Sequence, residues 1–280
     1  SVFLISLIVI AICWPFVSGL GNQHSDAQFH APSAQYWFGT DVHGRDLFGR
    51  VLAGARISLL VGLVGALVSL VIGVFWGATA GLLGGNWDNW MMRTVDILYS
   101  LPSIIFVIVI ITTLEGLIQG WVESIFGGDG SETARHILLY AGLGAVSWLT
   151  MARIVRGQVL ALREQQFVEA SRSLGLGTWP ILWRHILPNV FGVVIVYLTL
   201  TLPAVVLYES FLSYLGLGIQ PPHASLGSLI AEGAAQINPV RVYWWMILFP
   251  AGGLAALLMA LNFIGDGLRD VFDPKSTKES

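Results

Sequence analysis

The chain has 280 residues, of which 55% are hydrophobic and only 11% are charged. A soluble domain carries roughly 25% charged residues, so this composition excludes an ordinary soluble protein and a disordered chain. The net charge of −3 provides no basic surface for a nucleic acid, and the single cysteine, Cys13, excludes an internal disulfide framework and a cysteine-rich metal site. We therefore expect a polytopic membrane protein.

Six apolar stretches approach or exceed the length of roughly 20 residues that a helix needs to cross a bilayer. They are residues 2–20, 57–83, 97–114, 136–154, 190–215 and 242–264. Each stretch is too long for an ordinary strand, and a transmembrane β-barrel would need short alternating segments. The sequence predicts an all-α polytopic membrane protein with six transmembrane helices.

The first stretch follows Ser1 directly, without a Met or a basic region before it. We expect the natural start to lie upstream. A cleavable signal peptide is the alternative, but no small-residue cleavage site follows and further spans come later.

The distribution of Lys and Arg predicts the orientation, because cytoplasmic loops carry more of them. The loops after the second and fourth spans and the C-terminal tail hold nine: Arg93, Arg153, Arg156, Arg163, Arg172, Arg184, Arg269, Lys275 and Lys278. The opposite side holds five: Arg45, Arg50, Arg56, Arg135 and Arg241. This places both termini in the cytoplasm, with residues 21–55 outside, residues 155–189 inside and residues 269–280 as a cytoplasmic tail.

Small residues occupy every fourth position of the second span: Gly65, Ser69, Gly73, Gly77 and Gly81. This spacing places them on one helix face, where another helix backbone can approach closely. Packing within this chain is favoured over a dimer interface.

The fifth span contains the predicted pore or gate residues, Pro203 and Glu209. Pro102, Pro203 and Pro250 lie in or near spans, where a proline removes a backbone donor and bends a helix, either as a fixed kink or in a wall that rearranges. Glu209 is the one carboxylate deep in an apolar stretch, so we expect it to face the interior or a cavity. A hydrogen-bonded group is favoured over a proton relay.

Motifs of catalysis and metal binding are missing from the sequence. There is no G-x-x-x-x-G-K-[ST] for ATP, no H-E-x-x-H and no G-x-S-x-G. The spacing of His24, His30 and His43 fits no common zinc pattern. We expect no catalytic residue, no metal site and no cofactor of its own in this chain.

The longest cytoplasmic segment predicts two short helices. Residues 164–174 favour a helix, Gly175 and Gly177 end it, and Thr178 caps a second helix that leads through Pro188 into the fifth span. Apolar side chains crowd this segment and predict contact with a membrane surface or a partner: Leu174, Leu176, Trp179, Ile181, Leu182 and Trp183.

The same segment resembles the EAA loop of ATP-binding-cassette (ABC) importer permeases. Glu169, Ala170, Gly175, Leu187 and Pro188 stand in the register of that loop, whereas Ser171 and His185 depart from its usual Ala and Ile. The resemblance implies that the segment contacts the ATPases of the transporter. The predicted coupling residues are Glu169, Ala170, Ser171, Gly175, Leu176, Trp179, Leu187 and Pro188.

Further stretches are similar to permeases of the oligopeptide and dipeptide importer group: residues 38–46, 54–59, 92–96, 211–218 and 265–270. Residues 151–158 resemble most the oligopeptide C-type subunit of that group. The resemblance implies a type I ABC importer transmembrane domain, with its core at residues 56–268. It also implies a paralogous B-type permease subunit, two ABC ATPase subunits that bind ATP and Mg²⁺, an extracytoplasmic peptide-binding protein, a peptide substrate and location in the inner membrane.

The outer segment has two interpretations of equal weight. Gly39, Thr40, Asp41, Gly44, Arg45 and Asp46 either contact the binding protein or form a structural turn. Permeases for nickel, glutathione or antimicrobial peptides share much of the pattern. A proton-coupled secondary transporter or channel is the alternative from another class, and an intramembrane enzyme is disfavoured because no nucleophile–base pair is evident.

Overall fold

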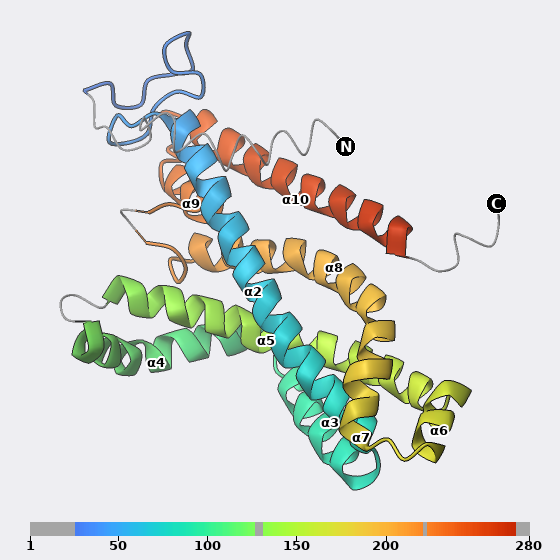
Figure 1. Cartoon of the computed structure of the whole chain (residues 1–280). Helices are drawn as coiled ribbons and strands as arrows, with labels where there is room; N and C mark the ends of the chain where they lie inside the picture. Colours follow the sequence, from blue (N-terminus) through green and yellow to red (C-terminus); the bar gives the residue numbers. More distant parts are fainter. Residues whose placement is uncertain (1–25, 127–130, 221–222, 273–280) are drawn as a thin grey trace.

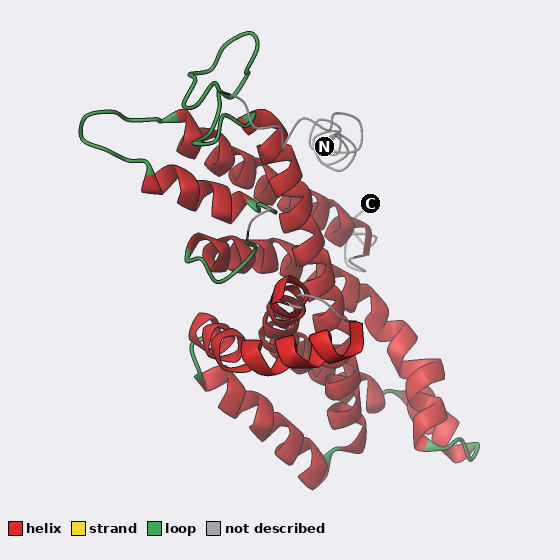
Figure 2. Ribbon diagram, turned by 90° about the vertical axis from the view of Figure 1, so that its left-hand side faces the viewer, coloured by secondary structure: helices red, strands yellow, loops and turns green. Residues whose placement is uncertain are grey.

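The computed structural model describes residues 26–126, 131–220 and 223–272, and most of them are helical (Figure 1; Figure 2). The elements in chain order are α2 (Leu47–Leu83), α3 (Gly85–Ser100), α4 (Ser103–Phe126), α5 (Ser131–Arg163), α6 (Gln166–Ser173), α7 (Thr178–Ile181), the π-helical turn η2 (Leu182–Ile186), α8 (Leu187–Tyr214), α9 (Leu226–Ala235) and α10 (Trp245–Phe272). The predicted all-α class is confirmed.

Five helical stretches of the described residues are long and apolar enough to cross a membrane. They are Leu47–Leu83, Ser103–Ile125, Ile137–Arg163, Thr178–Tyr214 and Trp245–Val271. These correspond to the second to sixth predicted spans. The first predicted span, residues 2–20, lies outside the described residues.

The boundaries of the third predicted span, residues 97–114, are wrong. Helix α3 ends at Ser100, Leu101 is extended with ψ 137°, and α4 begins at Ser103 and continues to Phe126. The residue before a proline avoids helical backbone angles, so Pro102 separates two helices here. Pro203 and Pro250, in contrast, lie inside the continuous helices α8 and α10.

The second span begins earlier than its apolar stretch. The side chain of Asp46 accepts a hydrogen bond from Gly49 N at 3.0 Å and caps α2, so the helix starts at Leu47 and carries Arg50 and Arg56 in its first turns.

Gly73, Gly77 and Gly81 of α2 face α5, as predicted for packing within the chain, and Gly65 faces Val205 of α8. A Cβ added at Gly73 would lie 2.6 Å from Cβ of Met151, and one added at Gly77 would overlap the main-chain carbonyl of Ala152. Close backbone approach holds helices together in lipid, where no hydrophobic force draws them together. The α2–α5 pair is therefore the centre of the bundle, and Figure 1 shows the two helices crossing.

The molecule has two distinct ends (Figure 1). Residues 26–46, at the start of α2, lie at one end beside α9. Helices α3, α6 and α7 lie at the other end, where α2 finishes. We call these the loop end and the α6–α7 end.

Candidate functional site

The turn between α6 and α7 is built around one glycine. Gly175 has a φ of +83°, which a residue with a side chain rarely adopts. Its N–H donates to the carbonyl of Arg172 at 2.9 Å, and the N–H of Leu176 donates to that of Ser171 at 3.2 Å. These two bonds form a Schellman motif, which satisfies the last carbonyls of α6 and turns the chain sharply. The predicted glycine break is confirmed, but the second helix is capped by Gly177, and Thr178 is its first residue.

One face of the α6–α7 segment is packed into the bundle. Val168, Ile181, Leu182 and Ile186 are almost fully buried among side chains of α2 and α5, including Leu82 and Val159. Burial of such side chains contributes roughly 1.5–3 kcal/mol each, or about 6–12 kcal/mol for the four. To shift a helix bundle from about 1% to 99% of one of two conformations, a partner must supply about 5.5 kcal/mol of differential binding free energy. The segment is therefore anchored firmly enough to move together with α2 and α5.

The opposite face of the segment is exposed. Glu169, Ala170, Gly175, Trp179 and Pro188 have exposed side chains or backbone, while Leu176 and Leu187 are partly buried. Ser171 is buried, and its hydroxyl donates to the carbonyl of Phe167 at 2.7 Å, within its own helix. A serine thus fits the position where the resembling loops have alanine. We call the exposed face the α6–α7 surface.

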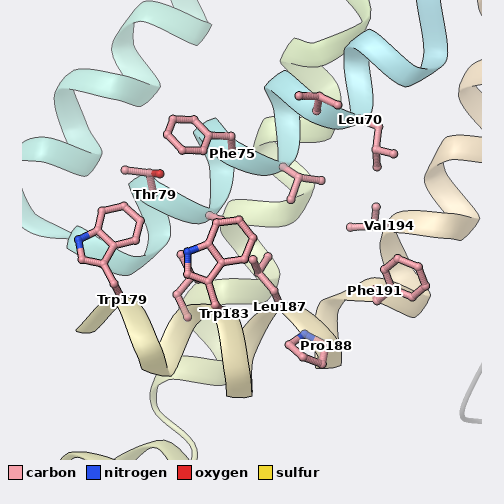
Figure 3. Close-up of a pocket in the computed structure, with 13 residues that line it drawn as sticks. Leu70, Phe75, Thr79, Trp179, Trp183, Leu187, Pro188, Phe191 and Val194 are labelled. Atoms are coloured by element: carbon pink, nitrogen blue, oxygen red, sulfur yellow. The ribbon is translucent and has the colours of Figure 1, made fainter. Parts of the chain in front are cut away.

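An apolar groove of about 530 Å³ runs between α2 and the segment from α7 to α8 (Figure 3). Phe75 and Leu70 of α2 line one side, and Trp179, Trp183 and Phe191 line the other. The predicted apolar cluster therefore divides in two. Ile181 and Leu182 pack into the chain, whereas Leu174, Trp179 and Trp183 are exposed, the two tryptophans along the groove.

The end of α2 is tied to its neighbours by arginines of α5. Arg156 binds the buried carboxylate of Asp88 in α3 through two hydrogen bonds, the Nη2 contact at 2.6 Å. Arg163 donates to the carbonyl of Gly81 at 3.0 Å and so satisfies an acceptor near the C-terminus of α2. From the sequence, both arginines are predicted only as loop charges, and no local pattern identifies their partners.

The loop end is held by a network of ion pairs. Arg50 donates from Nη1 to Asp41 at 2.6 Å and reaches both carboxylate oxygens of Glu232, at 2.6 and 2.9 Å. Arg45 donates from Nε to Asp41 at 2.6 Å. Burial by itself raises the pKa of Asp41. This effect is outweighed by the backbone N–H of Arg45, the charge of Arg50 and the backbone N–H of His43, so the pKa of Asp41 lies below its ordinary value.

Residues 39–46 form a tightly packed turn. Gly39, Thr40, Asp41 and Gly44 are buried, and a Cβ at Gly39 would lie 2.6 Å from the carbonyl oxygen of His30. The main-chain carbonyl of Thr40 accepts from Trp245 Nε1 at 3.2 Å. These four residues support the structural interpretation of the segment. Of the six predicted contact residues, only Arg45 and Asp46 are partly exposed and so accessible to another protein.

Glu209 and Pro203 lie inside the packed chain. Glu209 accepts hydrogen bonds from the hydroxyls of Ser58 in α2 at 2.7 Å and Ser213 at 2.6 Å. Ser58 in turn accepts from the N–H of Leu226, at the start of α9, at 3.4 Å. Glu209 is fully buried and thus joins α2, α8 and α9, which is the hydrogen-bonded role that the sequence analysis favoured. A role in the pore would require these helices to separate.

Two charged residues of the loop-end network are not predicted as site residues from the sequence. Arg50 is predicted only as a loop charge, and Glu232 belongs to no predicted site. The signal was present, because a charge in an otherwise apolar helix is costly unless it is paired, and Glu232 lies in the apolar helix α9. Among the described residues, no group of three or more His, Cys, Asp and Glu side chains is placed to hold a metal ion.

Comparisons with known proteins agree over most of the chain. The family model of binding-protein-dependent transport system inner membrane components matches residues 69–278. The oligopeptide transport system permease protein OppC of Haemophilus influenzae is 42% identical over 98% of this chain and 83% of its own length. The same-named protein of Escherichia coli is 44% identical over 97% of this chain and 85% of its length. The dipeptide transport system permease protein DppC of Bacillus subtilis is 42% identical over 97% of this chain and 79% of its length.

A solved structure shares the fold. A chain of the MetNI methionine ABC transporter, in an inward-facing conformation, aligns with a TM-score of 0.59 and 21% identity. The alignment covers 81% of this chain and 97% of that chain.

Proposed function

This chain belongs to the family of binding-protein-dependent transport system inner membrane components, and we propose how its two ends serve the import of peptides as a C-type permease subunit of an ABC importer. Its all-α transmembrane domain is of the type I importer class. The observation that carries the proposal is the α6–α7 segment, which is buried on one face and exposed on the other.

The α6–α7 surface is the proposed docking site of the ATPase subunits. Glu169, Ala170, Gly175 and Trp179 offer a mixed polar and apolar face at the end of the bundle. Val168, on the buried face of α6, packs against side chains of α2 and α5. Movement of an ATPase on the exposed face would therefore displace both helices together, which is how a packed core transmits a shift. ATP and Mg²⁺ are bound by the ATPases, not by this chain.

The remaining partners follow from the family. A paralogous B-type permease subunit completes the passage as a heterodimer, and an extracytoplasmic peptide-binding protein delivers peptide to the loop end. Within residues 39–46, Arg45 and Asp46 are the proposed contact residues for this binding protein. The chain lies in the inner membrane with both termini in the cytoplasm, so that the α6–α7 end faces the ATPases.

The proposed organisation of the chain keeps the units expected from the sequence. The first of these units, residues 1–20, lies outside the described residues; residues 21–55 are the proposed extracytoplasmic segment and residues 56–268 the proposed core. Residues 155–189 contain the coupling loop, and residues 269–280 form a cytoplasmic tail.

One exposed leucine and one exposed valine give a matched test of the docking site. Leu174, at the α6–α7 end, is 83% exposed, and Val240, at the other end of the chain's spans, is 85% exposed. We expect Leu174→Asp to lower the amount of ATPase that co-purifies with the permease and to lower ATP-dependent peptide uptake into proteoliposomes. Val240→Asp serves as the control and leaves co-purification unchanged. Equal amounts of ATPase with both variants would contradict the docking site.

A further inference from the structure

A small pocket lined by hydroxyl groups lies between α5, α8 and the junction of α3 with α4. Its volume is about 180 Å³. Six of its lining residues carry a hydroxyl: Tyr99, Ser103, Ser147, Thr150, Thr201 and Tyr208. The remaining three are apolar, and none is charged. We call it the hydroxyl pocket.

The part of the hydroxyl pocket formed by α5 and α8 lies at the middle of these helices, whereas Ser103 is the first residue of the span Ser103–Ile125 and Tyr99 lies near the end of α3. Thr150 is the central residue of the span Ile137–Arg163, and Thr201 stands at the centre of α8. Side chains at this depth that face lipid are expected to be apolar, because hydrocarbon offers no hydrogen-bond partner. The four hydroxyls of α5 and α8, on Ser147, Thr150, Thr201 and Tyr208, therefore indicate a side of the bundle that faces a polar passage.

Several of these hydroxyls have unused hydrogen-bonding capacity. Ser147 and Thr201 donate to carbonyls of their own helices, at 2.9 and 2.7 Å, and keep their oxygen lone pairs free to accept. Within the described residues, the side-chain hydroxyls of Ser103, Thr150 and Tyr208 have no hydrogen-bond partner. A hydroxyl both donates and accepts. The pocket thus offers donors and acceptors without a fixed charge.

The pocket occupies a different face of α8 from Glu209. Glu209 and its neighbour Val206 point into the packed interior, whereas Thr201, Ala204 and Tyr208 face the pocket. At the pocket's margin, Tyr99 lies under the guanidinium of Arg153, 4.1 Å from the ring centroid. Arg153 also pairs with Asp96 at 2.7 Å, so its charge is already engaged.

We propose that the hydroxyl pocket is a contact site for the main chain of a peptide in transit, which rests on the proposed function above. The peptide main chain repeats one N–H donor and one C=O acceptor at almost every residue, and neutral hydroxyls match both. Because no lining residue is charged, the pocket does not select among charged side chains. The site is therefore specific for the peptide backbone and tolerant of sequence.

The test uses the complete transporter in proteoliposomes with its binding protein and ATP. Thr150→Val and Tyr208→Phe each remove a hydroxyl with little change of shape. We expect each to slow uptake about threefold to tenfold, the effect of one lost neutral hydrogen bond. The loss is expected to be equal for tripeptides with acidic, basic and apolar side chains. Thr112→Val is the control, because Thr112 is exposed on α4 and bonded to its own helix at 2.9 Å.

The outcomes separate the two proposals. If the wild-type transporter imports no peptide, the proposed function fails. If it imports peptide and the double variant of Thr150 and Tyr208 is equally fast, the pocket proposal alone fails. Losses confined to peptides of one charge also overturn it.

A labelling experiment tests the site independently of transport rates. With Cys13 replaced by serine, Ala204→Cys provides a single thiol on the pocket wall. We expect a water-soluble thiol reagent to label it, and labelling to slow when peptide is present during turnover. No labelling, or labelling that peptide leaves unchanged, would contradict the proposal.

Discussion

At the loop end the chain is held by buried charges, whereas the α6–α7 end is anchored by apolar side chains. Asp41, Arg50 and Glu232 join residues 26–46, α2 and α9 through short ion pairs. Val168 and Ile181 anchor α6 and α7 by burial among aliphatic side chains. Ion pairs with defined geometry fix one arrangement, while an apolar contact leaves the outer face free for a partner. The comparison suggests that the loop end is rigid and that movement enters at the α6–α7 end.

Removing Arg50 is expected to have the largest effect on stability. Arg50→Ala leaves Asp41 and Glu232 with Arg45 as their remaining cation, 2.6 Å from Asp41 and 3.8 Å from Glu232. Loss of one partner of a buried pair costs about 3–5 kcal/mol. The unfolding temperature of the purified complex measures this. Arg241→Ala, at an exposed position, is the control and leaves the temperature unchanged. A small shift for Arg50→Ala would show that the loop end does not depend on its charges.

The second prediction concerns the backbone of the α6–α7 turn. Gly175→Val forces a β-branched residue to φ +83°, at a cost of about 1–3 kcal/mol, although nothing lies within 4 Å of the added Cβ. We expect ATP hydrolysis to continue while peptide uptake falls, with the complex still assembled in the membrane.

Gly177→Ala provides the matched control for that turn. Its φ of −69° is ordinary for alanine, and the nearest atom to the new Cβ is Cδ of Pro180 at 3.6 Å. We expect wild-type coupling from this variant. If both substitutions, or neither, uncouple hydrolysis from uptake, the left-handed turn is not the sensitive element.

A smaller effect is expected at Glu209, between the two ends. Glu209→Gln retains a side chain that can bond to Ser58 and Ser213, so the change in stability is expected to stay within about 1.5 kcal/mol, the range of one neutral hydrogen bond. Peptide uptake is measured across external pH values. A loss of uptake that varies with external pH would support the proton-relay alternative.

The smallest effect is expected from mild acid at the loop end. The pKa of Asp41 is lower in the folded chain than its ordinary value of 3.8. Its contribution to stability is therefore full above that value and is lost only as the pH falls through the lower, folded-state pKa. Unfolding temperatures of wild type and Asp41→Asn should differ by a constant amount from pH 8 to pH 5. A difference that shrinks in this interval would contradict the lowered pKa.

The sequence alone determined the membrane class, the approximate positions of five described spans and the glycine break at Gly175. These features depend on local composition: the length of an apolar run, the spacing of small residues and the freedom of glycine to adopt positive φ. The resemblance of residues 169–188 to a known loop also required only residue order.

Only the tertiary structure decided which side of each helix faces the interior. The fifth span carries Thr201, Tyr208 and Glu209 close together in the sequence. Packing against α2 buries Glu209, whereas Thr201 and Tyr208 line the hydroxyl pocket. Likewise, Arg50 and Glu232 are 182 positions apart in the chain, and nothing in their local sequence identifies the pair. Contacts between distant segments depend on how the helices cross, which no local pattern specifies.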